Sequence, residues 1–172
     1  MNKTMNYLKY YPTDVVNGDG VRCTLFVSGC IHACRGCYQK KSWKVDAGFK
    51  FDDAMVQQII NDLADTKIVR RGLTLTGGDP LHDANLDEIL RLCKIVKSEF
   101  PDKNIFMWTG YLYEELEGKR REIVDLVDVL IDGKFEQDNT APNLRYRGSR
   151  NQRVIDVQAT LKSDKMVLHY ED

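Results

Sequence analysis

Four short apolar segments that alternate with helical patterns constrain the fold of this chain more than any other feature. Each is typical of a β-strand, because β-branched and aromatic residues dominate it and charge is scarce. The segments cover residues 22–28, 73–76, 104–108 and 128–131. Strands and helices that alternate at this spacing predict βαβ units, in which consecutive strands run parallel.

The intervening segments have the 3.6-residue apolar spacing of helices that pack on a core. The first helix begins at Asp52 or Asp53, either of which can cap it. The third runs roughly over residues 114–127, with an interruption near Gly118. The apolar positions are Met55, Ile59, Ile60 and Leu63 in the first helix and Leu86, Ile89, Leu90, Cys93 and Val96 in the second.

The chain length limits how many such units can form. A complete eight-unit barrel needs about 250 residues, whereas this chain has 172. We therefore predict the α/β class, as an open or partial (β/α) barrel with a mostly parallel sheet and four to six βα units. Ligands of such sheets bind at the C-terminal ends of the strands. The loops after Ser28, Thr76, Trp108 and Ile131 are expected to form one site on one face.

Composition predicts one globular domain over residues 1–172, with residues 157–172 as a candidate C-terminal extension. The chain is 42% hydrophobic and 30% charged, and its formal net charge is -1. This charge favours neither nucleic acid nor a membrane surface as a partner, and no apolar run of about 18 residues predicts a membrane span. Residues 1–7 lack the apolar core of a signal peptide, so we expect a cytoplasmic protein with reduced thiols.

The strongest chemical signal is a cluster of three cysteines, Cys30, Cys34 and Cys37, in a C-x3-C-x2-C arrangement on a loop. Thiolates hold iron–sulfur clusters, and a 4Fe–4S cube normally takes four of them. Three thiolates with no obvious fourth leave one iron without a protein ligand. An open coordination position lets a metal bind a substrate directly.

Other interpretations of the triplet stay open. A structural zinc site would use His32 as its fourth ligand, although His32 lies only two residues from Cys30. Unligated thiols are a further alternative. Cys23 could supply a fourth thiolate, but the strand pattern places it on an apolar face, and Cys93 lies on the apolar stripe of a helix, where a buried inert thiol is expected.

A second motif, Gly77-Gly78-Asp79-Pro80, follows the second strand. By itself it is an ordinary connection from a strand to a helix. Its functional interpretation is more specific, because glycines let backbone carbonyls approach an ammonium group closely and Asp79 adds a carboxylate.

These motifs together resemble a known family. The triplet is similar to the signature of the radical S-adenosylmethionine enzymes. Residues 17–29 before it, and Gly36, Cys37 and Tyr38 at its end, resemble the branch that activates anaerobic, glycyl-radical ribonucleotide reductases. Many superfamily members place an aromatic residue just before the third cysteine, whereas here Gly36 holds that position and Tyr38 follows. The resemblance covers roughly residues 7–156.

The resemblance implies a mechanism. The three cysteines hold a 4Fe–4S cluster, and the amino and carboxylate groups of S-adenosylmethionine chelate its open iron. Reductive cleavage gives methionine and a 5′-deoxyadenosyl radical, which removes hydrogen from a glycine of the reductase. The cofactors supply the chemistry, while the protein binds and orients them. The implied partners are the large, glycyl-radical subunit of the reductase and an electron donor such as flavodoxin.

The resemblance also implies a set of site residues. Residues 147–153, which concentrate cations, are similar to a segment of this branch and are expected to meet an anionic group or the partner, with a solvated loop as the alternative. The cofactor-binding residues that the resemblance implies are Gly36, Cys37, Tyr38, Gly77, Gly78, Asp79, Thr109, Asp132 and Lys134.

Rival functions remain at this stage. An activase of another glycyl-radical enzyme, such as pyruvate formate-lyase, keeps the chemistry and changes the target. A radical enzyme that acts on a small molecule is a second rival. A zinc-binding interaction module without catalysis belongs to a different class, and it predicts a colourless protein where the cluster predicts a brown one.

Overall fold

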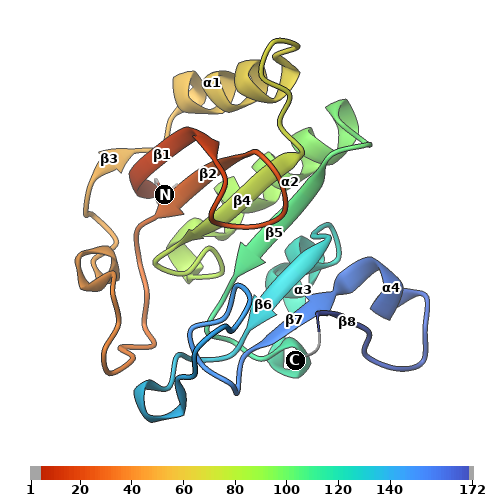
Figure 1. Cartoon of the computed structure of the whole chain (residues 1–172). Helices are drawn as coiled ribbons and strands as arrows, with labels where there is room; N and C mark the ends of the chain where they lie inside the picture. The colour runs from red at the N-terminus through yellow and green to blue at the C-terminus, as the bar shows by residue number, and fades with distance from the viewer. Residues whose placement is uncertain (1–4, 171–172) are drawn as a thin grey trace.

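One eight-stranded sheet runs through the part of the chain that the computed structural model describes, residues 5–170 (Figure 1). The ends of the domain predicted over residues 1–172 lie outside these described residues. The strand order is β3-β1-β2-β4-β5-β6-β7-β8. The strands are β1 (Asn6–Asp14), β2 (Arg22–Val27), β3 (Phe49–Lys50), β4 (Gly72–Gly77), β5 (Asn104–Trp108), β6 (Val129–Asp132), β7 (Arg153–Asp156) and β8 (Leu168–Tyr170).

Four α-helices connect or flank these strands within the same described part of the chain. They are α1 (Asp53–Ala64), α2 (Leu86–Glu99), α3 (Gly118–Val124) and α4 (Val157–Leu161). Short 3-10 turns occupy Lys40–Trp43, Asp83–Asn85, Tyr113–Glu115 and Gln137–Asn139. The third predicted helix is thus shorter than expected, because a separate turn comes before Gly118.

The prediction of an open or partial (β/α) barrel with a mostly parallel sheet is wrong. Strands β2, β4, β5 and β6 pair in parallel. The flanking pairings β1–β2, β1–β3, β6–β7 and β7–β8 are antiparallel, so only three of the seven pairings between described strands are parallel. Among the described helices, α1, α2 and α3 alone connect parallel strands, which is fewer than the four to six units expected.

The connections explain this correction. Residues 15–21 join β1 to β2 without a helix, and a connection this short returns the chain antiparallel to itself. Residues 133–152 join β6 to β7 with only one 3-10 turn, so no crossover helix carries the chain back for a parallel pairing. Local apolar patterns predict strands, but they do not say which way a strand pairs with its neighbour.

The main core lies between the sheet and α1, α2 and α3; α2 and α3 lie behind the sheet in Figure 1. Helix α1 starts where the sequence indicated, because the Asp52 carboxylate accepts a hydrogen bond from the N–H of Met55 at 2.9 Å. Leu73 and Leu75 of β4 and Leu92 of α2 are fully buried in this core.

The opposite face of the sheet carries a smaller apolar cluster of Phe106, Val129, Ile131 and Val154. The loop between β1 and β2 crosses in front of β4 on this face (Figure 1). At the start of β2, directly after this loop, the Arg22 side chain is fully buried. Its Cζ atom lies 4.3 Å from the ring centroid of Phe106, and its Nε donates to Thr74 Oγ1 at 2.8 Å. Burial lowers the pKa of Arg22 to about 10.

Asp19 of this loop binds the C-terminal strand. Its carboxylate accepts hydrogen bonds from the hydroxyls of Tyr146 at 2.6 Å and Tyr170 at 2.8 Å, and lies 3.0 Å from Nε2 of His169. Partial burial raises the pKa of Asp19, but the three hydrogen bonds outweigh it and bring the pKa down to about 2. Strand β8, which lies in the predicted C-terminal extension, is thereby fixed to the loop between β1 and β2.

The part of the chain that the structure describes contains no helix long and apolar enough to cross a membrane.

Candidate metal centre and cofactor pocket

The three cysteines lie on a loop that starts at the C-terminal end of β2. The N–H of Gly29 donates to the carbonyl of Ser42 at 2.6 Å, and the N–H of Cys30 donates to the carbonyl of Trp43 at 3.2 Å. A turn then brings the N–H of Cys37 to the carbonyl of Cys34 at 3.2 Å. The loop is therefore held by its own backbone. All three cysteines are half-buried and carry free thiols.

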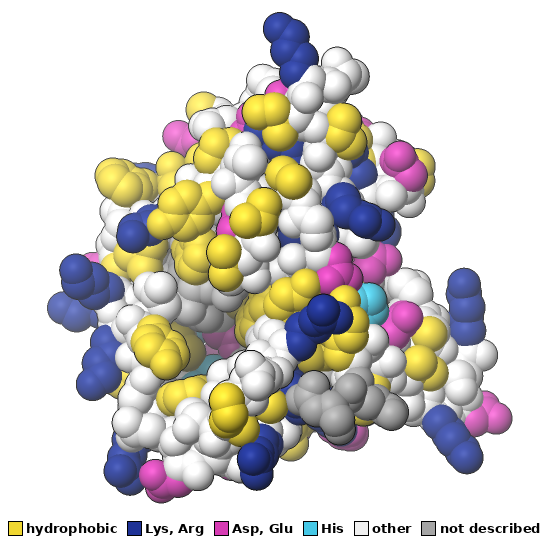
Figure 2. Space-filling view, viewed as in Figure 1, with side chains coloured by type: hydrophobic (Ala, Val, Ile, Leu, Met, Phe, Trp, Pro, Cys, Tyr) yellow, Lys and Arg dark blue, Asp and Glu magenta, His cyan; other side chains and the backbone are white. Residues whose placement is uncertain are grey.

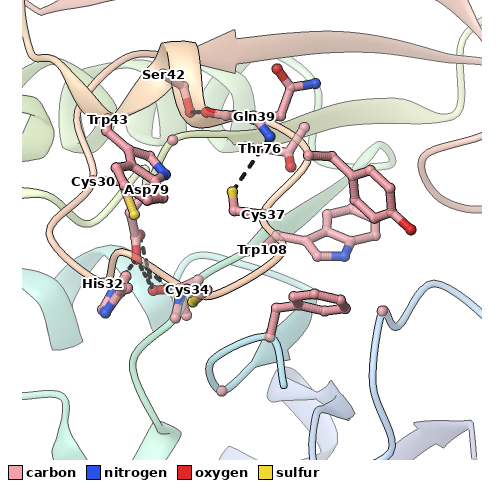
Figure 3. A pocket seen from close by; sticks show the side chains of 18 of the residues that line it. Cys30, His32, Cys34, Cys37, Gln39, Ser42, Trp43, Thr76, Asp79 and Trp108 are labelled. Atoms are coloured by element: carbon pink, nitrogen blue, oxygen red, sulfur yellow. Dashed lines mark hydrogen bonds and ion pairs between the residues drawn. The ribbon is translucent and has the colours of Figure 1, made fainter. Parts of the chain in front are cut away.

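A cavity of about 230 Å³ lies beside this loop, and all three cysteines line it. It opens at the C-terminal ends of the parallel strands, where a hollow is visible at the lower left of Figure 2. Figure 3 shows side chains from the cysteine loop and from strands β4 and β5 around it. The lining residues are Cys30, His32, Cys34, Cys37, Tyr38, Gln39, Ser42, Trp43, Thr76, Gly77, Gly78, Asp79, Trp108, Thr109, Gly110, Gly133, Phe135, Gly148 and Gln152.

The turn after β4 packs directly on the start of the cysteine loop. The N–H of Gly78 donates to the carbonyl of Val27 at 2.7 Å, and the N–H of Asp79 donates to the carbonyl of Gly29 at 2.7 Å. A Cβ atom on Gly78 would lie 2.5 Å from the carbonyl oxygen of Gly29. Position 78 therefore needs a glycine, because any side chain there would push the two loops apart.

Asp79 joins the cysteine loop to the end of β5. Its carboxylate accepts from the Thr109 hydroxyl at 2.9 Å and from the N–H groups of Gly110 at 3.0 Å and Leu81 at 2.8 Å. Its Oδ2 atom also lies 2.6 Å from Nε2 of His32, and these two side chains are 1% and 4% exposed (Figure 3). Protein donors on both oxygens leave this carboxylate little capacity for a further ligand.

His32 is the main site residue whose role sequence reasoning missed. It entered the sequence analysis only as a candidate zinc ligand, but its Nε2 is bound to Asp79 and its ring packs edge-on against Tyr111, with centroids 4.7 Å apart. The partner lies 47 residues away along the chain. No local pattern indicates such a contact.

The metal-free thiol of Cys30 is held protonated. Burial, with the nearby Asp79 carboxylate and the other two cysteines, raises the pKa of Cys30 to about 11, although a hydrogen bond from the backbone of His32 opposes this rise. Cluster ligation requires thiolates, so metal binding must release this proton.

The predicted cofactor residues fall into two groups. Tyr38, Gly77, Gly78, Asp79 and Thr109 line the cavity together with the cysteines.

Gly36, Asp132 and Lys134 do not line it. Gly36 has a φ of +79° and packs next to the side chain of Gln137. The buried Asp132 carboxylate is bound to Arg153 at 2.5 Å, and Lys134 is exposed. Gly133, between these two residues, lines the cavity, as do Gly148 and Gln152 of the cationic segment 147–153.

The cavity and its donors fit an iron–sulfur cluster. Among the described residues, no three His, Cys, Asp or Glu side chains converge on a single metal-ion position. Each cysteine of a 4Fe–4S site binds a different iron, so its thiols need not converge in this way. Beside the cavity, the buried Nε1 atom of Trp43 has no hydrogen-bond partner in the described part of the chain.

A comparison with known families gives the class of protein, a single-cluster iron–sulfur protein. Residues 16–155 match a family model described as a 4Fe-4S single cluster domain. The chain is 61% identical over 148 residues to the anaerobic ribonucleoside-triphosphate reductase-activating protein of Haemophilus influenzae. The aligned residues cover 86% of this chain and 96% of that relative.

Other relatives carry the same name. The protein of Escherichia coli K12 is 55% identical over 150 residues, which cover 87% of this chain and 97% of the relative. The protein of the enterobacteria phage T4 is 46% identical over 150 residues, which cover 87% and 93%. This chain therefore belongs to the family of anaerobic ribonucleoside-triphosphate reductase-activating proteins, and the family resemblance found in the sequence is confirmed.

Proposed function

We propose that this chain activates an anaerobic ribonucleotide reductase as a radical S-adenosylmethionine enzyme. The observation that carries the proposal is the meeting of two motifs at one cavity. The three thiols of the cysteine loop and the turn Gly77-Gly78-Asp79 of the next strand line the same pocket. The names of the relatives, reported above, point to the reductase as the protein acted upon.

In this proposal Cys30, Cys34 and Cys37 ligate a 4Fe–4S cluster. The chain has two further cysteines, Cys23 and Cys93, and both lie with no exposure in the core. A cluster with three protein thiolates keeps one iron open for S-adenosylmethionine. When both groups are bound, they supply the one-electron cleavage of S-adenosylmethionine and the removal of a hydrogen atom from a glycine of the reductase.

The protein's own part is to bind and orient. We propose that the backbone of Gly77 and Gly78 binds the ammonium group of the cofactor, since a glycine turn allows a close approach. The carboxylate of Asp79 already has four protein donors, so its part is to hold the turn against His32 and Thr109. The Asp132 carboxylate supports the adjoining loop by accepting hydrogen bonds from the Arg153 side chain and, at 2.8 Å, from the N–H of Tyr113.

Exposed aromatic side chains at the edge of the cavity favour a protein, rather than a small molecule, as the substrate. The side chain of Tyr38 is 90% exposed at the cavity, and its ring lies 6.1 Å from that of Phe135. Aromatic residues that face solvent beside a site are typical anchors for a protein partner. We propose that the reductase segment that carries the glycine enters over this edge.

We propose that the electron donor is an acidic carrier protein such as flavodoxin. Residues 35–50 hold five lysines and arginines but one carboxylate, Asp46, although the whole chain has a net charge of -1. Lys40, Lys41 and Lys44 are exposed and make no ion pair with any residue of the described part. Lys40 lies three residues after Cys37, so their Cα atoms are at most about 11 Å apart. Dark-blue side chains gather along the left edge of Figure 2, beside the hollow.

Reduction kinetics test this donor surface. Changing Lys40 and Lys41 together to glutamate should slow reduction by the carrier protein and leave reduction by dithionite unchanged, because steering by charge acts on a charged protein partner. The same change at the exposed Lys162 and Lys165 is the matched control. Equal rates with the carrier for the patch variant and the wild-type chain would exclude this surface.

Anaerobic reconstitution tests the function itself. The chain is loaded with iron and sulfide, reduced, and mixed with S-adenosylmethionine and an anaerobic ribonucleotide reductase; electron paramagnetic resonance should then detect a glycyl radical on the reductase. Cys34→Ala should lose both the cluster signal and the radical. Cys93→Ala removes a thiol buried in α2, so it should keep both. A Cys34→Ala variant with full activation would overturn the proposal.

The same experiment separates the rivals. A radical formed on pyruvate formate-lyase but not on the reductase would favour the other glycyl-radical activases. A colourless protein with bound zinc would favour the non-catalytic module. We propose a cytoplasmic location, because reduced thiols are available for ligation there.

A further inference from the structure

Tyr146 has a backbone conformation that tyrosine rarely adopts. Its φ is +63°, in the left-handed region, which is unfavourable for a residue with a large side chain. A strained residue of this kind persists only where its surroundings hold it, and such residues concentrate at ligand sites. Tyr146 directly precedes the cationic segment 147–153, of which Gly148 and Gln152 line the cavity. Its contacts therefore bear on the shape of the cavity.

The side chain of Tyr146 is anchored by residues outside the cavity. Its hydroxyl donates to Oδ1 of Asp19 at 2.6 Å, and the same oxygen accepts from the hydroxyl of Tyr170 at 2.8 Å. The ring packs edge-on against Phe106, with centroids 5.9 Å apart. These contacts fix the tyrosine ring to the loop between β1 and β2 and to the apolar cluster behind it.

The backbone of Tyr146 binds a residue that does line the cavity. Its carbonyl accepts a hydrogen bond from Nε1 of Trp108 at 2.8 Å, and the two rings pack edge-on with centroids 6.2 Å apart. In Figure 3, Trp108 lies across the cavity from Cys30 and Trp43. An indole has one N–H and no acceptor, so Trp108 offers the cavity an apolar ring. Because the backbone of Tyr146 directs the carbonyl, it also directs this ring.

We propose that Tyr146 is a positioning residue that orients Trp108 for the binding of S-adenosylmethionine. The Asp19 carboxylate holds the tyrosine ring, the strained backbone directs the carbonyl, and the carbonyl fixes the indole as one wall of the cavity. Without the bond to Asp19, the backbone of Tyr146 can relax to a negative φ, which turns the carbonyl away from Trp108. The inference rests on the proposed function, because it assigns this wall to that cofactor.

The test compares two tyrosines that donate to the same oxygen of Asp19. Tyr146→Phe and Tyr170→Phe each keep an aromatic ring and remove one hydroxyl. The two hydrogen bonds are similar in length, so both variants should have similar midpoints of urea denaturation. Of the two residues, it is Tyr146 that binds Trp108. A difference between the variants at Trp108 therefore reports the link to the cavity and not a general loss of stability.

Fluorescence of Trp108 in the metal-free chain is the first measurement. The chain has two tryptophans, so a Trp43→Phe background leaves Trp108 as the single emitter. Tyr146→Phe should shift the emission to longer wavelength and increase quenching by acrylamide, because the indole loses its partner. Tyr170→Phe should leave both unchanged. An unchanged emission in Tyr146→Phe, or an equal change in the two variants, would overturn the proposal.

Calorimetry with S-adenosylmethionine is the second measurement, on the cluster-loaded chain with Trp43 in place. If the indole is correctly oriented in about one tenth of the Tyr146→Phe molecules, the apparent Kd rises about tenfold. Tyr170→Phe should bind like the wild-type chain. A loaded wild-type chain that binds no S-adenosylmethionine would overturn the proposed function and this inference with it. Normal binding by the wild-type chain and an equal affinity in Tyr146→Phe would overturn this inference alone.

Discussion

His32→Ala tests whether the contact between the cysteine loop and the turn after β4 stabilises the fold before any cluster binds. The Nε2 atom of His32 lies 2.6 Å from Oδ2 of Asp79, and both side chains are nearly inaccessible to solvent. The substitution removes this hydrogen bond and the edge-on contact of the ring with Tyr111. Asp79 keeps its bonds to Thr109, Gly110 and Leu81, so its carboxylate is not left bare.

The expected loss follows from these two contacts. A hydrogen bond to a charged group contributes about 1.5–3 kcal/mol, and an aromatic pair contributes about 0.5–1.5 kcal/mol. His32→Ala should therefore lower the free energy of unfolding by about 2–4 kcal/mol. This is a large part of the roughly 5–15 kcal/mol that holds an ordinary domain together.

Urea denaturation of the metal-free, reduced chain measures this loss. His169→Phe is the control, because it removes only the contact of Nε2 with Asp19 at 3.0 Å and keeps an aromatic ring against Phe106 and Tyr170. The pair of His169 and Asp19 is 26% and 29% exposed, so the control should lose only about 1 kcal/mol. The reasoning is refuted if His32→Ala loses no more stability than His169→Phe.

Two further substitutions test the turn after β4 and the loop between β1 and β2. Gly78→Ala places a methyl carbon 2.5 Å from the carbonyl oxygen of Gly29, so it should destabilise the chain by about 1–3 kcal/mol and weaken S-adenosylmethionine binding in calorimetry. Gly118→Ala is its control, because no atom lies within 4 Å of the added methyl carbon and the substitution strains only the backbone, whose φ is +60°. If Gly78→Ala binds S-adenosylmethionine as tightly as the wild-type chain, the prediction is contradicted. Asp19→Asn should lower the free energy of unfolding at neutral pH by about 1–2 kcal/mol, a value reduced for partial exposure. Since the folded pKa of about 2 lies below the usual 3.8, this stabilisation is present above pH 3.8 and lost as the pH falls through 2. In urea titrations from pH 7 to pH 2, the difference in unfolding free energy between the wild-type chain and Asp19→Asn should shrink. A difference that stays constant with pH would contradict this prediction.

The sequence predicted the elements that depend on local pattern. The buried strands β4 and β5 were indicated because Leu73, Leu75 and Ile105 make their segments apolar. Strand β1 was missed because it is half-exposed, contains Pro12 and lies at the flank of the sheet, where apolar alternation is weak. The direction of pairing was also beyond the sequence, since it depends on which segments meet in space.

The site likewise has one part that local sequence predicted and another that depends on how the loops pack. The thiols are adjacent in the chain, so their spacing alone indicated a metal centre. The bond between His32 and Asp79 joins residues 47 positions apart, and the unpaired donor of Trp43 is defined by what does not contact it. Both features exist only after the loops have packed, which is why residue patterns could not indicate them.

The predicted location of the loops at one edge of the sheet did not depend on the wrong prediction of the fold, for a physical reason. The four parallel strands β2, β4, β5 and β6 form an uninterrupted block in the centre of the sheet. Their C-terminal ends meet at one edge, and the cysteine loop, the glycine turn, Thr109 and Gly133 all follow those ends. The antiparallel strands flank this block on both sides. A prediction of the site needs only the direction of the central strands, whereas a prediction of the fold needs every pairing out to the edges.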